Sequence, residues 1–170
     1  MSLEKKLGAA TRDAYGRALA ELGKTNPEIV VLDGDLAKST KTDQFRKLFP
    51  ERFFNVGIAE ANMVGIASGL AASGKLPFIS SFACFMFCKG YDQFRMSVAF
   101  PELNVKIVAS HGGISVGEDG ASQQSIEDIA LMSSLPGFVV IVPSDAHQTK
   151  ALVREAARHK GPVYMRTGRP

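Results

Sequence analysis

The stretch RFFNVGIAEANMVGIASGLAASGKLPFIS, residues 52–80, holds two candidate strands and the helix between them. Residues 52–55 favour a short strand, and residues 59–72 favour a helix rich in small side chains. Residues 77–80 favour a second, buried strand because they form a compact apolar run. A strand, a helix and a strand in this order are typical of a parallel β-sheet with helical crossovers.

The same alternation continues on both sides of this stretch. Four more apolar runs predict buried strands, at residues 29–32, 105–109, 138–142 and 163–165. Five more segments predict helices, at residues 11–23, 42–48, 91–99, 125–133 and 146–159. We therefore expect an α/β fold, with a parallel β-sheet of about five to six strands and helices on both faces. Ligands bind such sheets at the edge where the carboxyl ends of the strands meet.

The composition predicts one domain spanning residues 1–170, because 45% of the chain is hydrophobic and no linker interrupts it. Residues 1–6 are expected to be disordered or to derive from an expression vector. The last predicted strand runs almost to Pro170, so we expect the chain to be one part of a larger enzyme.

Charge and hydropathy exclude several classes of function. The formal net charge is +3, and Lys and Arg are spread along the chain, so no nucleic-acid-binding face is expected. No segment reaches the roughly 20 apolar residues of a membrane span, and the N-terminus lacks a signal peptide. Cys84 and Cys88 are expected to be small buried side chains in a reducing compartment. We expect a cytoplasmic protein.

Three stretches that follow predicted strands carry candidate functional residues. Glu60 falls in the first turn of the helix at residues 59–72, where an acidic residue can simply complement the helix dipole. Its small and apolar neighbours favour instead a buried carboxylate with a function.

The second stretch, residues 80–88, holds three phenylalanines and a methionine directly after a strand. Such a run is by default part of the core. At the carboxyl edge of a sheet, however, phenylalanines three apart can form a wall for a flat heteroaromatic ring.

The third stretch, residues 110–124, combines four glycines with His111, Glu118 and Asp119. Glycines allow a backbone to approach a ligand closely. The spacing matches neither a P-loop nor the dinucleotide-binding glycine pattern, so a nucleotide site has little support.

The ordered set of motifs resembles the central, pyrimidine-binding domain of transketolases. The resemblance covers nearly the whole chain and rests on six blocks, Asp33–Leu36, Val56–Met63, the Phe82/Phe85 pair, Gly117–Gln123, Pro143–Asp145 and Tyr164–Thr167. It implies a thiamine-diphosphate-binding fold and a domain that binds the aminopyrimidine half of that cofactor. It also implies a transferase of the pentose phosphate pathway, which moves a two-carbon ketol unit between ketose and aldose phosphates.

The resemblance assigns the cofactor-binding residues. Glu60 is implied to hydrogen-bond the ring nitrogen N1′ of the aminopyrimidine and so to activate the cofactor. Phe82 and Phe85 match the aromatic residues that stack on this ring. Cys88 stands where a third aromatic is common, and Phe87 is the candidate to substitute for it. Asp35 matches an acidic residue near the thiamine and the subunit contact.

The resemblance also assigns the substrate-binding residues. The positions that contact substrate phosphate are Arg12, Ser39, His111 and Arg166. Asp119 matches a residue that contacts a substrate hydroxyl, and Gln123 stands where many members carry His. Glu60, His111 and Asp119 are the implied catalytic set. Taken alone, His111 could equally be structural, Arg12 a solvated helix charge and Ser39 a helix N-cap.

The implied partner is a diphosphate-binding domain or subunit, which holds a divalent metal, Mg²⁺ or Ca²⁺. No metal site is expected in this chain, and the isolated chain is expected to be inactive and to form a homodimer. Two close relatives compete with transketolase, 1-deoxyxylulose-5-phosphate synthase and the beta subunits of 2-oxoacid dehydrogenases. A non-catalytic binding or assembly module with the same fold is the alternative from another class.

Overall fold

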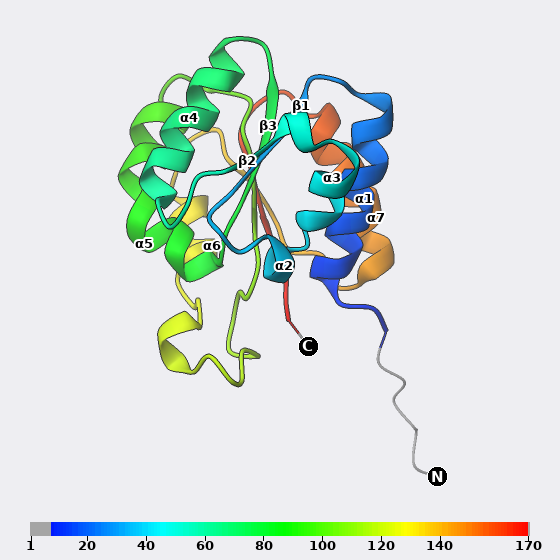
Figure 1. Cartoon of the computed structure of the whole chain (residues 1–170). Helices are drawn as coiled ribbons and strands as arrows, with labels where there is room; N and C mark the ends of the chain where they lie inside the picture. Colours follow the sequence, from blue (N-terminus) through cyan, green and yellow to red (C-terminus); the bar gives the residue numbers. More distant parts are fainter. Residues whose placement is uncertain (1–7, 170) are drawn as a thin grey trace.

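The computed structural model describes residues 8–169, which form one six-stranded sheet between two layers of helices (Figure 1). All the strand pairs are parallel, and the strand order is β2-β1-β3-β4-β6-β5. The strands are β1 (Ile29–Asp33), β2 (Phe53–Asn55), β3 (Leu76–Ser80), β4 (Lys106–Ala109), β5 (Val139–Ile141) and β6 (Val163–Arg166). The predicted α/β fold with a parallel sheet is therefore confirmed. The expectation that residues 1–6 are disordered lies outside the described residues.

Helices cover both faces of the sheet. One layer contains α1 (Thr11–Thr25), α3 (Asp43–Leu48) and α7 (Ala146–Arg158), and the other contains α4 (Glu60–Ala72), α5 (Ala83–Gln93) and α6 (Asp128–Ser133). The short elements are α2 (Ala37–Thr40), the 3-10 turns η1 (Pro50–Arg52) and η3 (Ala121–Gln123), and the π-helical segment η2 (Phe94–Ala99). Within residues 8–169, no helix is long and apolar enough to cross a membrane.

The hydrophobic core has two halves because successive strand residues point to opposite faces. On β1, Val30 and Leu32 pack with Met63 of α4, whereas Ile29 and Val31 pack with Leu19 of α1. Strands β1, β3 and β4 are buried along their whole length, which explains their continuous apolar runs.

Three expectations from the sequence are wrong in detail. Strand β5 lies at the edge of the sheet, and Val139 is 39% exposed, so this strand is not buried. The helix predicted to begin at Tyr91 begins at Ala83, because the phenylalanine-rich run is itself helical. Cys84 is buried and its pKa is raised by desolvation to about 11, but Cys88 is exposed, and neither forms a disulfide.

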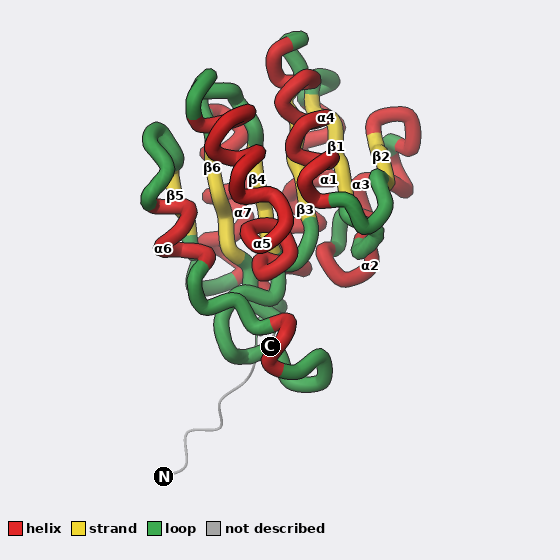
Figure 2. Tube along the Cα trace, turned by 90° about the vertical axis from the view of Figure 1, so that its left-hand side faces the viewer, coloured by secondary structure: helices red, strands yellow, loops and turns green. Residues whose placement is uncertain are grey.

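The carboxyl ends of the strands all lie at one end of the molecule (Figure 2). At this end β1, β3 and β4 lead directly into α2, α5 and the long segment 110–127. The chain after β6 reaches the same end. The three stretches singled out in the sequence therefore come together at the edge where ligands bind open parallel sheets.

Candidate functional site

Glu60 is a buried carboxylate at the N-terminus of α4. Its side chain is 1% exposed, and its Oε1 accepts a hydrogen bond of 3.0 Å from the Ser81 hydroxyl. Oε2 accepts no hydrogen bond from residues 8–169, although the Lys89 ammonium lies 3.3 Å away. The expected burial of Glu60 is thus confirmed, and one of its oxygens remains available to a hydrogen-bond donor.

The aromatic wall stands beside this carboxylate. The rings of Phe82 and Phe85 are nearly parallel, with their centroids 5.4 Å apart. The Lys89 ammonium lies 4.6 Å from the Phe85 ring centroid, so Phe85 and Glu60 share a neighbour. Phe87 is 8% exposed and belongs to the hydrophobic core, whereas Cys88 is exposed on the same helix.

His111 lies against the other side of this wall, since its ring stacks on Phe82 at 3.7 Å between centroids. It is 1% exposed, its Nδ1 shares a hydrogen bond of 2.8 Å with the Ser110 hydroxyl, and its backbone φ is +61°. Burial, followed by the nearby cations Arg12 and Arg169, lowers the pKa of His111 to about 4. The imidazole is therefore neutral at pH 7 and can offer a hydrogen bond without a charge.

Arg12 and Ser39 are brought together by α1 and α2. Nη1 of Arg12 donates to the Ser39 carbonyl at 3.3 Å, and Nε of Arg12 is buried without a hydrogen-bond partner among the described residues. Desolvation lowers the pKa of Arg12 below its usual value. Ser39 lies inside α2, whose N-cap is Leu36, so the N-cap interpretation of Ser39 is wrong.

A buried carboxylate holds α2 in place. Asp33, at the end of β1, is fully buried and accepts three short hydrogen bonds, from the Leu36 amide at 2.6 Å and from the Thr40 and Thr42 hydroxyls at 2.7 and 2.8 Å. Desolvation raises the pKa of Asp33 despite these donors. No pattern in the sequence predicts this structural role for Asp33.

Arg166 projects from the end of β6 against the glycine-rich segment. Its Nη2 donates to the Ser125 carbonyl at 2.6 Å, and its Nε lies 3.4 Å from Oδ2 of Asp128. Gly112 makes room for it, since a Cβ at this position would lie 2.1 Å from Nε of Arg166. This close packing explains why residue 112 has no side chain.

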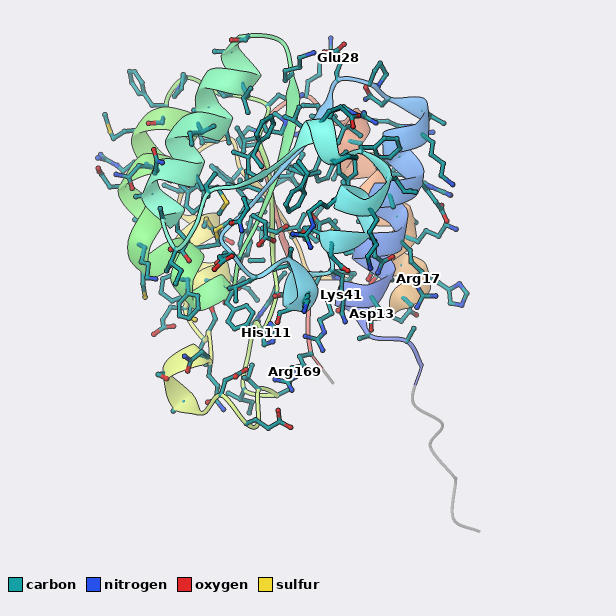
Figure 3. All side chains as sticks on the ribbon, viewed as in Figure 1. Asp13, Arg17, Glu28, Lys41, His111 and Arg169 are labelled. Atoms are coloured by element: carbon teal, nitrogen blue, oxygen red, sulfur yellow. The ribbon has the colours of Figure 1, made fainter. Side chains whose placement is uncertain are left out.

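The far part of the segment is held by Arg169, a residue outside the motifs of the sequence. Its guanidinium pairs with Asp119 at 3.1 Å and Glu118 at 2.9 Å. The signal was present, because Arg169 follows the predicted last strand and therefore had to reach this edge. Figure 3 shows Arg169 near His111 at the end of the molecule where Lys41 and Asp13 also lie, and these last two are ion-paired at 3.3 Å.

The structure brings the predicted site residues toward the carboxyl edge of the sheet, where several of them contact one another. Arg12, Arg169 and Asp119 are all close enough to affect the pKa of His111. Asp35, with a positive φ, accepts a hydrogen bond from Asn55 at 2.8 Å. The side-chain oxygen of Gln123 accepts a hydrogen bond from the Ser122 hydroxyl, and its backbone amide donates to the Gly120 carbonyl. No group of three or more His, Cys, Asp or Glu residues in residues 8–169 could hold a metal ion.

The fold and the site define an α/β domain that carries a buried carboxylate, two stacked phenylalanines and several arginines at the carboxyl edge of its sheet. A family model described as "Transketolase, pyrimidine binding domain" matches residues 8–170, so the chain belongs to this transketolase domain family. The match confirms the resemblance seen in the sequence.

Known proteins agree with this assignment. The chain is 55% identical over 158 residues to a "Putative transketolase C-terminal section" from Methanocaldococcus jannaschii, covering 93% of this chain and 50% of that protein. It is 47% identical to human transketolase over 95% of this chain and 26% of that protein. The chain thus spans about half, or a quarter, of the curated relatives it matches.

Solved structures show the same fold. One, described as "Split gene transketolase, inactive beta4 tetramer", has a TM-score of 0.85 and 57% identity, covering 95% of this chain and 52% of that chain. Transketolase from Campylobacter jejuni has a TM-score of 0.87 and 28% identity, covering 95% of this chain and 26% of that chain. The thiamine-diphosphate-binding fold, pyrimidine domain, is therefore the fold of this protein.

Proposed function

We propose that this chain supplies the pyrimidine-binding half of the active site of a thiamine-diphosphate-dependent transketolase. The observation that carries the proposal is the geometry of Glu60, a buried carboxylate with one oxygen unused by hydrogen bonds, next to the aromatic wall. A buried carboxyl group without a full set of partners is costly unless a ligand completes it.

The residues at this site fit the aminopyrimidine ring. Oε2 of Glu60 can hydrogen-bond a ring nitrogen and share a proton with it, while Ser81 orients the carboxyl through Oε1. Phe85, which is only partly buried, offers an apolar face for stacking, and Phe82, whose ring stacks on Phe85 and His111, supports it from behind. Cys88 and Asp35 complete the proposed cofactor contacts from the rim. When bound, thiamine diphosphate supplies the electron sink for cleaving and forming the bond to the two-carbon unit.

The arginines at this edge of the sheet suit the phosphate of a sugar substrate. Arg12 and Arg166 provide guanidinium groups that can grip a phosphate with paired hydrogen bonds, with Ser39 beside Arg12. His111 is neutral and can polarise or orient a substrate oxygen. Asp119 would accept a hydrogen bond from a substrate hydroxyl, with Gln123 as a further polar contact.

The other half of the active site must come from a diphosphate-binding domain or subunit, where Mg²⁺ or Ca²⁺ is expected. The relatives support this division, since one is described as a C-terminal section and another as a split-gene transketolase whose beta4 tetramer is inactive. We expect the isolated chain to be inactive and to form a homodimer. The exposed apolar residues near the start of α4, such as Ile58 at 75% exposure, are consistent with a subunit contact.

The test is reconstitution with the diphosphate-binding section. Ketol transfer between a ketose phosphate and an aldose phosphate is expected only when both sections, the cofactor and a divalent metal are present. Pyruvate-dependent turnover without ketol transfer would instead favour 1-deoxyxylulose-5-phosphate synthase or a 2-oxoacid dehydrogenase. A complex that binds no thiamine diphosphate by calorimetry would favour the non-catalytic assembly module.

A further inference from the structure

A buried carboxylate lies directly behind Arg166. Asp128, the first residue of α6, is fully buried, and its Oδ2 lies 3.4 Å from Nε of Arg166. Arg166 is the one cation within ion-pair distance of Asp128 among residues 8–169. A buried charge needs a partner, so the negative charge of Asp128 and the position of Arg166 depend on each other.

Tyr164, on β6, holds the carboxylate of Asp128 in place. Tyr164 lies two residues before Arg166 on β6, so both side chains project from the same face of the sheet. The Tyr164 hydroxyl donates to Oδ2 of Asp128 at 2.6 Å. Burial, and then the charge of Asp128, raise the pKa of Tyr164 well above its usual value, so the phenol remains a donor.

The contacts of Arg166 occupy one edge of its guanidinium. Nη2 donates to the Ser125 carbonyl. Nε is buried 3.4 Å from Oδ2 of Asp128, within ion-pair distance but without a hydrogen bond to any described residue, and Nη1 forms no hydrogen bond with any described residue either. The side chain of Arg166 is 16% exposed. The arginine is thus anchored by one edge, which leaves the Nη1 side to bind an anion.

We propose that Asp128, held by Tyr164, is a positioning residue that orients Arg166 toward substrate phosphate. The inference rests on the proposed function, because it takes Arg166 to be a phosphate ligand. It adds a buried second carboxylate that neither the motifs nor the family resemblance had assigned. The alternative is that Asp128 only stabilises the packing of α6 on β6.

Two measurements separate positioning from packing. In the reconstituted enzyme, kcat/KM is compared for an aldose phosphate and for an unphosphorylated aldose of equal chain length. Asp128→Asn is expected to lower kcat/KM for the phosphorylated acceptor about tenfold, the typical value of a charge-assisted contact, mainly through KM. The value for the unphosphorylated acceptor should change less than about twofold. Asp92→Asn, at an exposed position of α5, is the matched control and should change neither.

The second measurement needs no activity. In ¹⁵N-labelled chain, the Nε–H of Arg166 should exchange slowly with water in the wild type, because Nε is buried against Asp128. Asp128→Asn should accelerate this exchange. If Asp128→Asn does not fold, Tyr164→Phe decides the matter, because it removes the hydroxyl that holds Asp128 and should produce the same two effects more weakly.

The proposal is overturned if the variant lowers kcat/KM equally for both acceptors, or if the exchange of the Arg166 Nε–H is unchanged. Arg166→Lys distinguishes a failure of the proposed function. If this change spares the phosphorylated acceptor, Arg166 is not a phosphate ligand. The exchange measurement then still shows whether Asp128 holds Arg166.

Discussion

Lys89 stands in contact with both parts of the proposed pyrimidine site. Its ammonium lies 3.3 Å from Oε2 of Glu60 and 4.6 Å from the centroid of the Phe85 ring. Lys89 is 44% exposed, whereas Glu60 is 1% exposed, so a half-exposed ammonium pairs with a buried carboxylate. The Lys89 ammonium lies against Oε2 of Glu60 and the Phe85 ring, the two groups that the aminopyrimidine is proposed to contact. Cofactor binding should therefore displace the Lys89 side chain.

The first prediction concerns the stability of this ion pair. Lys89→Met should lower the free energy of unfolding by about 2 kcal/mol, because it leaves the buried Glu60 charge without its counterion. Urea denaturation measures the change. The matched control is Lys75→Met, which breaks a surface pair with Glu28 and should cost less than about 0.5 kcal/mol. In the double variant with Glu60→Gln, the effect of Lys89→Met should largely disappear, and equal effects of the two lysine changes would refute the counterion role.

The second prediction concerns acid stability. The pKa of His111 is lowered to about 4 in the folded chain, so between pH 6.5 and 4 the unfolded chain binds a proton that the folded chain does not. The stabilising contribution is therefore complete above pH 6.5 and is lost as the pH falls toward 4. His111→Asn should flatten this part of the stability profile by on the order of 2 kcal/mol, since asparagine tolerates the positive φ.

The control for this profile is His147→Asn, because His147 is exposed at the start of α7. The loss of unfolding free energy between pH 6.5 and 4 should be the same in this variant as in the wild type. If His111→Asn loses as much unfolding free energy between pH 6.5 and 4 as the wild type does, His111 is not the group that causes this loss.

The third prediction concerns Asp33 at the end of β1, whose hydrogen bonds hold α2 in place. Asp33→Asn places an amide group against donors that all point at the carboxylate, so it should cost about 1–3 kcal/mol of unfolding free energy. Asp43→Asn, which removes an exposed-side pair with Lys47 within α3, should cost no more than about 0.5 kcal/mol. Thermal denaturation compares the two variants directly. Similar melting temperatures would contradict the structural role of Asp33.

The fourth prediction concerns Gly112. An alanine Cβ there would lie 2.1 Å from Nε and 2.4 Å from Cγ of Arg166, so Arg166 must move. Gly112→Ala should therefore lower affinity for phosphorylated substrates in the assembled enzyme about tenfold. Gly117→Ala is the matched control in the same segment, because nothing lies within 4 Å of the added Cβ. If KM for phosphorylated substrates is the same in the two variants, Arg166 does not bind substrate phosphate as proposed.

The sequence alone was sufficient for the parallel sheet and for the burial of Glu60. Strands β1 and β3 are buried on both faces, so their apolar runs are continuous and easily recognised. Strand β5 has a similar run but lies at the sheet edge, and strand order is not encoded in local periodicity. The sequence does not reveal the start of α5, because residues 82–88 have no polar spacing that would indicate a helical period.

The partners of the site residues were beyond sequence reasoning for a related reason. Asp119 pairs with Arg169, 50 residues away, and Asp128 meets Tyr164, 36 residues away. Such pairs exist only after the crossovers have brought sheet edges and segments together. Motif positions could therefore point to Arg166 and Asp119, whereas the residues that hold them in place became visible only in the folded chain.

The most direct test of the central claim is the ketol-transfer rate of Glu60→Gln in the enzyme reconstituted with its diphosphate-binding section. Glutamine preserves the shape of the side chain and can still accept from Ser81, but it cannot share a proton with a ring nitrogen. At saturating thiamine diphosphate, the variant should assemble normally and lose at least about a hundredfold in kcat, as expected for a lost general acid–base group. A correctly assembled Glu60→Gln enzyme with the wild-type kcat would contradict the account.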